Sequence, residues 1–157
     1  RNSDGTYVKT NDEATGTSAF VKTEQPWFTE EKIQAIKDLP IWLVQSADDP
    51  VVVPANYLLP TYQALVQAGA DNTWVSYFET VEGTDSPGTT YMGHFSWIYL
   101  FNNQVTGVQD KAAIAASTDA EIFGFEPSNA TGGGTAAATV GETTYTNIFE
   151  WLNAQSR

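Results

Sequence analysis

Four consecutive apolar residues, Ile41-Trp42-Leu43-Val44, constrain the fold of this chain more than any other stretch. They show no alternation of apolar and polar residues, which predicts a strand buried on both faces of a parallel sheet. Residues 55–68 then carry apolar side chains at helical spacing and stop at Gly69, and residues 74–78 form a second strand-like run. A strand, a helix and a strand at this spacing predict a βαβ unit with a parallel pair and a right-handed crossover.

The flanking sequence predicts three further helices. The first is capped by Thr29, carries two acidic residues in its first turn and stops at Pro40. A short helix is expected within residues 110–120. The apolar spacing in residues 145–155 predicts a terminal amphipathic helix.

The chain divides into a core, an arm and an insertion. Residues 29–103 and 145–155 hold the regular apolar patterns and are expected to form the core. Residues 1–28 are polar, and two β-favouring patches in them predict a hairpin or an extended arm. Residues 104–144 are expected to be an insertion whose low-complexity tract, 131–139, forms a flexible surface loop.

Composition narrows the classes of partner. The chain has 157 residues, 41% of them apolar, which is enough for one globular core. Its formal net charge of −12 would repel nucleic acid and anionic membranes, so neither is expected as a partner. No stretch approaches the roughly 20 apolar residues of a membrane span. The few basic residues and the Thr, Ala, Gly and Asn-rich tracts are typical of secreted bacterial enzymes, so an extracellular location is expected.

An acid and a histidine follow the two predicted strands. Asp49 lies five residues beyond Val44, and His94 follows the loop after Phe78. Loops at the carboxyl ends of parallel strands are where such sheets bind ligands. An acid that orients a histidine, which in turn activates a nucleophile, is the arrangement of hydrolytic triads. Asp49 and His94 are therefore the candidate catalytic pair.

Each of these residues also has a structural interpretation. A single histidine is most often an ordinary surface or core residue, and an aspartate before Pro50 is common in turns for backbone reasons alone. Asp48 is an alternative to Asp49 as the acid. We favour Asp49 because it directly precedes the turn proline.

The nucleophile of such a triad is missing from this sequence. No Gly-x-Ser-x-Gly elbow occurs, and Ser46, Ser86 and Ser96 have no glycine-flanked strand-to-helix setting. With one histidine and no cysteine the sequence also argues against a zinc site, and the acidic residues of the insertion lack calcium-loop spacing. No cofactor or metal is expected.

Four segments together resemble the C-terminal portion of secreted α/β-hydrolases in the predicted-peptidase and polyhydroxybutyrate-depolymerase-like esterase group. The similarity covers about half of the chain, and its segments are Leu39–Val44, Ala47–Val52, Gly93–Trp97 and Phe149–Leu152. The resemblance implies that Asp49 is the triad acid and His94 the base. The oxyanion-hole donors and the nucleophile have no matching positions here, and the segment after Asn103 is longer than the family's usual connection.

The expected fold is therefore α/β, the C-terminal part of one α/β-hydrolase domain that an N-terminal part outside this chain completes. Since the first residue is Arg, the chain is expected to be a mature fragment of a longer precursor or a cloned piece. Limited cleavage of the precursor would leave it associated with an N-terminal chain carrying the serine. The expected activity is hydrolysis of small-molecule carboxylic esters, with peptide bonds as an open alternative. A non-catalytic module that binds carbohydrate or a protein partner is the rival interpretation.

Overall fold

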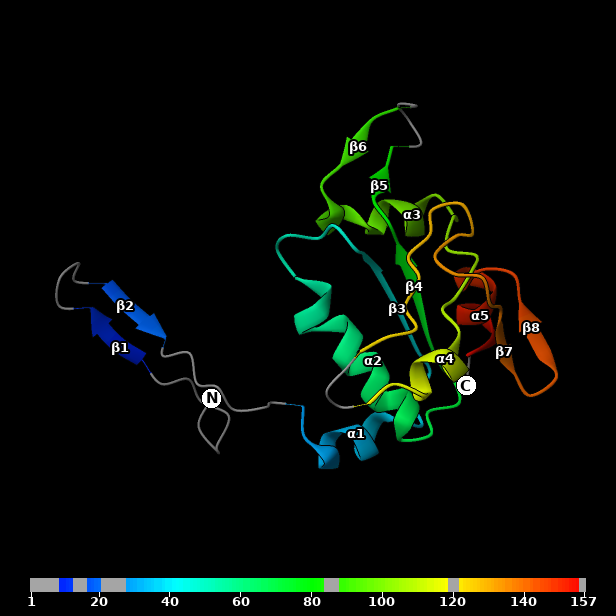
Figure 1. Cartoon of the computed structure of the whole chain (residues 1–157), viewed down its shortest axis with the longest axis horizontal. Helices are drawn as coiled ribbons and strands as arrows, with labels where there is room; N and C mark the ends of the chain where they lie inside the picture. Colours follow the sequence, from blue (N-terminus) through cyan, green and yellow to red (C-terminus); the bar gives the residue numbers. More distant parts are fainter. Residues whose placement is uncertain (1–8, 13–16, 21–27, 84–87, 119–121, 156–157) are drawn as a thin grey trace.

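A parallel pair of strands, β3 (Ile41–Ser46) and β4 (Thr73–Phe78), forms the centre of the molecule in a computed structural model (Figure 1). The structure describes residues 9–12, 17–20, 28–83, 88–118 and 122–155. The register of the pair runs from Ile41 opposite Thr73 to Ser46 opposite Phe78. The predicted βαβ unit is confirmed, and the chain is of the mixed α/β class.

The crossover of this unit is α2 (Leu58–Gln67), preceded by the short 3₁₀ helix η1 (Pro54–Asn56). The regular helix begins three residues later than its sequence pattern predicts, because the chain first makes the 3₁₀ turn. Gly69 terminates it with a φ of 84°, a left-handed conformation that favours glycine.

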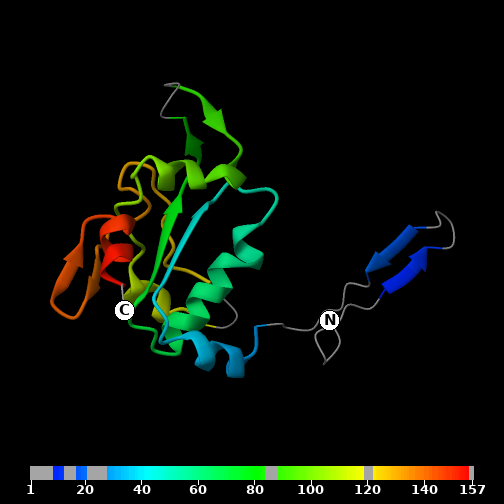
Figure 2. The same ribbon diagram turned by 180° about the vertical axis from the view of Figure 1, so that it is seen from behind.

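Helices cover both faces of the strand pair, so the fold has three layers (Figures 1 and 2). Val75 of β4 packs with residues of α2 and α4 (Lys111–Ala115) on one face. Trp74 and Phe78 face the opposite way and pack against α3 (Trp97–Phe101) and α5 (Ile148–Ala154). Alternate residues of β4 therefore anchor opposite layers, as the pleat of a strand requires.

Helices α1 and α5 lie where the sequence predicts them, with narrower bounds. Helix α1 spans Glu30–Ile36, and its N-cap residue Thr29 has an extended backbone but makes no side-chain cap. Helix α5 is capped by Asn147, whose side chain accepts from the amides of Phe149 and Glu150. It starts three residues later than expected because Thr143–Tyr145 forms a strand, β8.

A half-buried amide, Asn72, fastens α5 to the sheet. Its Oδ1 accepts from Nε1 of Trp151 at 2.7 Å and from Nε1 of Trp74 at 3.0 Å. Its Nδ2 donates to Gln155 at 2.8 Å. Since Asn72 precedes β4 directly, the last helix is held to the start of the strand that leads toward the candidate site.

The glycine-rich tract within residues 131–139 is not the flexible surface loop that its composition predicts. Gly132, Gly133 and Gly134 are buried. A Cβ on Gly133 would lie 2.5 Å from the Cβ of Ser76, and its φ is 101°. The tract is low in complexity because its backbone packs directly onto β4, where side chains do not fit.

This packing closes one edge of the sheet. The amide of Tyr77 donates to the carbonyl of Gly133 at 2.8 Å, and the carbonyl of Tyr77 accepts from Ser128 at 3.0 Å. The carbonyl of Val75 accepts from the amide of Gln109 at 2.9 Å. The predicted insertion therefore supplies hydrogen-bond partners to the outer edge of β4.

The other edge, along β3, has no neighbouring strand in the part of the chain that the structure describes. The amides of Ile41 and Ala47 donate toward β4. Because backbone groups alternate in direction along a strand, those of Trp42 and Val44 are directed away from β4. Residues 41–44 are half-buried, whereas every residue of β4 is buried. Within the described residues, the open edge of this strand pair is thus confined to β3.

Three antiparallel pairs complete the described structure. Strands β1 (Lys9–Asp12) and β2 (Thr17–Phe20) pair within the predicted arm, whose other residues lie outside the described ranges except Phe28. Strands β5 (Val81–Glu82) and β6 (Thr90–Tyr91) follow β4, and β7 (Ala138–Val140) pairs with β8. No helix in the described ranges is long and apolar enough to cross a membrane.

Candidate active site

The carboxylate of Asp49 is buried in the loop that leaves the carboxyl end of β3. Its Oδ1 accepts hydrogen bonds from the amides of Val51 at 2.8 Å and Val52 at 2.9 Å. This is a side-chain turn of the kind that aspartate forms with the backbone following it. The loop therefore folds around the carboxylate and fixes its direction.

The second carboxylate oxygen of Asp49 meets His94. Nδ1 of His94 lies 3.2 Å from Oδ2 of Asp49, and the histidine belongs to the 3₁₀ helix η2 (Gly93–Phe95). The side chain of Asp49 is 5% exposed and that of His94 is 40% exposed. Since a carboxylate is an acceptor, this contact favours the imidazole tautomer that carries its proton on Nδ1 and leaves Nε2 as the basic nitrogen.

Asp49 is suited to remain ionised in this environment. Burial on its own raises the pKa of the carboxyl group, but hydrogen bonds from the backbone amides of Val52 and Val51 lower it. The side chains of Gln45 and His94 lower it further, and the net result is a pKa below the ordinary value. A carboxylate held charged in this way orients a neighbouring imidazole without taking up its proton.

Gly93 makes the approach of His94 to the acid loop possible. A Cβ added to Gly93 would lie 2.2 Å from Oδ1 of Asp48 and 2.5 Å from the amide nitrogen of Asp49. No side chain fits in that space, so η2 contacts the peptide between the two aspartates directly. The close approach of the two backbones thus explains why a glycine precedes the histidine in the sequence.

The structure brings Asp49, and not Asp48, to His94. Asp48 is exposed, and its carboxylate accepts a short hydrogen bond from the hydroxyl of Ser46. Asp48 therefore supports the turn after β3, as expected for the residue that does not face the histidine.

The serines of the chain take structural positions where they are described. Ser46 is fully buried and donates to Asp48. Ser96 is buried at the N-cap of α3. Ser86 lies outside the described residues. None of the described serines occupies a turn between a strand and a helix, which is where the expected nucleophile would be exposed.

Gln45 is a site residue that the sequence interpretation missed. It is buried at the end of β3, and its Nε2 donates to Oδ2 of Asp49 at 3.2 Å and to the carbonyl of Val52. The signal in the sequence was a polar amide directly after four apolar residues, four positions before the candidate acid.

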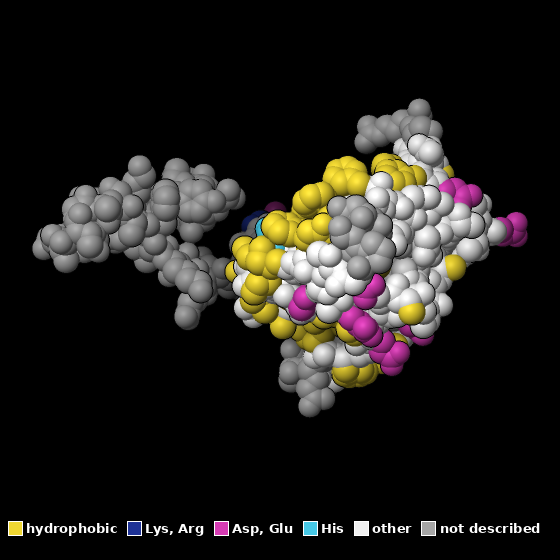
Figure 3. All heavy atoms as spheres, turned by 90° about the horizontal axis from the view of Figure 1, so that it is seen from above, with side chains coloured by type: hydrophobic (Ala, Val, Ile, Leu, Met, Phe, Trp, Pro, Cys, Tyr) yellow, Lys and Arg dark blue, Asp and Glu magenta, His cyan; other side chains and the backbone are white. Residues whose placement is uncertain are grey.

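Exposed hydrophobic side chains gather around His94, which Figure 3 shows beside them. Phe95 lies tilted beside the histidine ring, and edge-to-face contacts continue the row to Trp97 and Phe101, which are 50% and 74% exposed. The acid loop contributes exposed apolar residues as well: Val51, Val52, Val53 and Tyr57. The surface around the histidine is therefore apolar although the chain as a whole is acidic.

Tyr99 does not belong to this surface, although it lies near the histidine in the sequence. It is 3% exposed and stacks on Phe78 at 4.1 Å between ring centroids. Its hydroxyl donates to the carbonyl of Thr80 and accepts from the amide of Glu82. Tyr99 is a core residue, and burial raises the pKa of its phenol.

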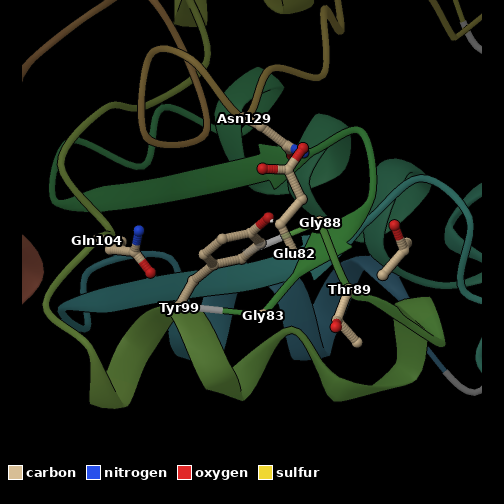
Figure 4. A pocket seen from close by; sticks show the side chains of 8 residues that line it. Glu82, Gly83, Gly88, Thr89, Tyr99, Gln104 and Asn129 are labelled. Carbon is tan, nitrogen blue, oxygen red and sulfur yellow. Dashed lines mark hydrogen bonds between the residues drawn. The ribbon is translucent and has the colours of Figure 1, made fainter. Parts of the chain in front are cut away.

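A pocket of about 590 Å³ lies between β5, β6 and α3, and neither Asp49 nor His94 lines it. Figure 4 shows the side chains of Asn129 and Glu82 pointing toward one another over the ring of Tyr99. The two side chains are joined by a hydrogen bond of 3.0 Å. Gln104 also lines the pocket, and its buried Oε1 has no hydrogen-bond partner within the described structure. The pocket is separate from the candidate pair.

The described residues contain no cluster of three or more His, Asp or Glu side chains that could hold a metal ion. Comparison with known proteins finds no matching family model, no matching curated protein and no matching solved structure.

Proposed function

We propose that this chain is the C-terminal part of a serine hydrolase of the α/β-hydrolase type that cleaves carboxylic esters. The observation that carries the proposal is the contact of His94 Nδ1 with the buried carboxylate of Asp49, 3.2 Å apart at the carboxyl end of a parallel strand. The residues that hold the carboxylate contribute as well, because they keep it charged and fixed in direction.

In this proposal His94 accepts a proton and releases it again in each of the two half-reactions. Its Nε2 takes the proton of a serine hydroxyl as the serine oxygen bonds to the ester carbon, and the bond to the leaving alcohol breaks as the same proton passes to that alcohol's oxygen. A water molecule repeats the sequence on the acyl-enzyme and releases the acid. Asp49 keeps the Nδ1 proton in place and stabilises the imidazolium that forms in each step.

The serine is proposed to come from an N-terminal chain or segment of the same precursor, separated by limited cleavage. Two features support this arrangement. Ser46, Ser76, Ser96 and Ser117 are buried, and the edge of β3 lacks a neighbouring strand within the described structure. Parallel sheets are ordinarily covered on both faces and extended by further strands. A secreted bacterial origin is part of the same proposal and rests on composition.

The proposal is tested with His94→Ala in the assembled enzyme. Labelling of the serine by a fluorophosphonate probe and hydrolysis of an aryl ester should both be lost, because an unassisted hydroxyl is a poor nucleophile. Glu31→Ala, an exposed change in α1, serves as the control and should leave both unchanged. Full labelling and activity in His94→Ala would refute the proposal.

A non-catalytic binding module is the second candidate, and the exposed aromatic row beside the histidine favours it. Trp97 and Phe101 present rings of the kind that stack on sugars or insert into a protein partner. This function predicts that Trp97→Ala weakens binding of an oligosaccharide or a partner while His94→Ala does not. The hydrolase predicts that His94→Ala abolishes turnover.

A further inference from the structure

Gln45 holds both ends of the turn that carries the candidate acid. Its Nε2 donates to Oδ2 of Asp49, the residue that begins the turn, and to the carbonyl of Val52, the residue that ends it. Gln45 itself lies on β3 and is 6% exposed. One buried amide therefore ties the acid loop to the rigid strand that precedes it.

The orientation of this amide is determined by its neighbours. Both groups in front of Nε2, the Asp49 carboxylate and the Val52 carbonyl, are acceptors and carry no proton to donate. With the amide turned over, its oxygen would face two acceptors and both hydrogen bonds would be lost. The two hydrogens of the –NH₂ group match the two acceptors.

The Asp49 carboxylate has its acceptor positions filled by this arrangement. Oδ1 takes two backbone amides, and Oδ2 takes Gln45 and His94, each at 3.2 Å. A carboxylate offers about four acceptor positions. Without Gln45 the oxygen that faces His94 would be held by the histidine alone, while Oδ1 would stay on its two backbone amides.

We infer that Gln45 is a positioning residue of the proposed hydrolase, which fixes the Asp49 carboxylate and through it the ring of His94. The inference rests on the proposed function. Gln45 touches neither the ester nor the nucleophile in this role. Its loss should slow the proton transfers at His94 while leaving substrate binding unchanged.

The test compares Gln45→Met with a matched control, Gln63→Met. Gln63 is also buried and also donates through Nε2 to two acceptors, Ser117 Oγ at 2.6 Å and the Thr118 carbonyl at 3.0 Å. It is on α2, away from the acid loop. Both changes remove a buried amide, so a general loss of packing would affect both variants alike.

In the assembled enzyme, Gln45→Met should lower kcat on an aryl ester by about 10- to 100-fold, the loss that corresponds to one hydrogen bond to a charged group. KM should stay within about twofold, since ground-state binding is not touched. Gln63→Met should leave both constants unchanged. Gln45→Asn keeps an amide that is one methylene too short, and it should reproduce the loss if Gln45→Met fails to fold.

A second readout does not depend on turnover. His94 is the only histidine of the chain, so ¹⁵N-histidine in this chain reports a single ring by NMR. The Nδ1 proton should be protected from exchange in the wild type and should exchange faster in Gln45→Met. Unchanged kcat and unchanged protection would overturn the inference. A wild-type enzyme that hydrolyses no ester would instead refute the proposed function, and the exchange measurement would still test the positioning.

Discussion

The contact between Gly93 and the acid loop leads to a prediction whose size follows from the structure. In Gly93→Ala the new Cβ would lie 2.5 Å from the amide nitrogen of Asp49, and unstrained contact begins at 3.4 Å. The η2 turn must therefore retreat by about 0.9 Å from the acid loop. A shift of this size along the contact direction stretches the His94–Asp49 distance from 3.2 Å to about 4 Å, which is no longer a hydrogen bond.

The expected loss of activity is about 100-fold. A hydrogen bond to a charged group contributes about 1.5–3 kcal/mol, and each 1.4 kcal/mol corresponds to a factor of ten in rate. An independent estimate agrees, because a displacement of about 1 Å in a reacting geometry costs about 100-fold. The assay is kcat/KM on an aryl ester in the assembled enzyme, with thermal unfolding measured in parallel.

Gly141→Ala is the matched control for this prediction. Gly141 lies in the turn between β7 and β8 with a φ of 60°, and nothing lies within 4 Å of its added Cβ. That change should cost stability through backbone strain but leave turnover intact. Activity of Gly93→Ala within threefold of the wild type would refute the reasoning, since the histidine would then not depend on the close approach.

Two further predictions concern the acid. Asp49→Asn should reduce turnover by roughly 10⁴-fold, as in other enzymes whose triad acid is neutralised, whereas Asp48→Asn should be mild; swapped effects in steady-state assays would move the acid by one residue. Because the folded pKa of Asp49 lies below its ordinary value of 3.8, its contribution to stability is complete above about pH 4 and is lost as the pH falls through the folded pKa. Denaturant titrations should therefore show the wild type losing stability faster than Asp49→Asn below about pH 4, and parallel curves would contradict this.

Regular patterns made part of this fold predictable. The unbroken apolar run at residues 41–44 and the helical spacing before Gly69 indicated the βαβ unit, and the structure contains it. Asp49 and His94 were expected at the same end of the strand pair and lie in contact. These predictions succeeded because strand and helix periods are local properties of the sequence.

The remaining features depend on backbone contacts that leave no period. The glycine tract within residues 131–139 was interpreted as a surface loop. Composition alone does not distinguish a glycine in a flexible loop from a glycine that packs against another backbone, as Gly133 does. The role of Gln45 was also hidden, because its two acceptors come from a loop whose path is set only after folding. The residues that form both features can be seen in the sequence, but their spacing forms no pattern that predicts the contacts.

The way the glycine tract meets β4 also bears on how this protein avoids aggregation. An unpaired strand edge is a template on which another chain can add a strand. Along β4 that template is occupied by irregular backbone: Gly133, with a positive φ, accepts from Tyr77, and Ser128 and Gln109 donate to the strand's carbonyls. A strand of a second molecule therefore cannot pair with the outer edge of β4. Self-association through the sheet could occur only at the edge of β3 among the described strands of this pair.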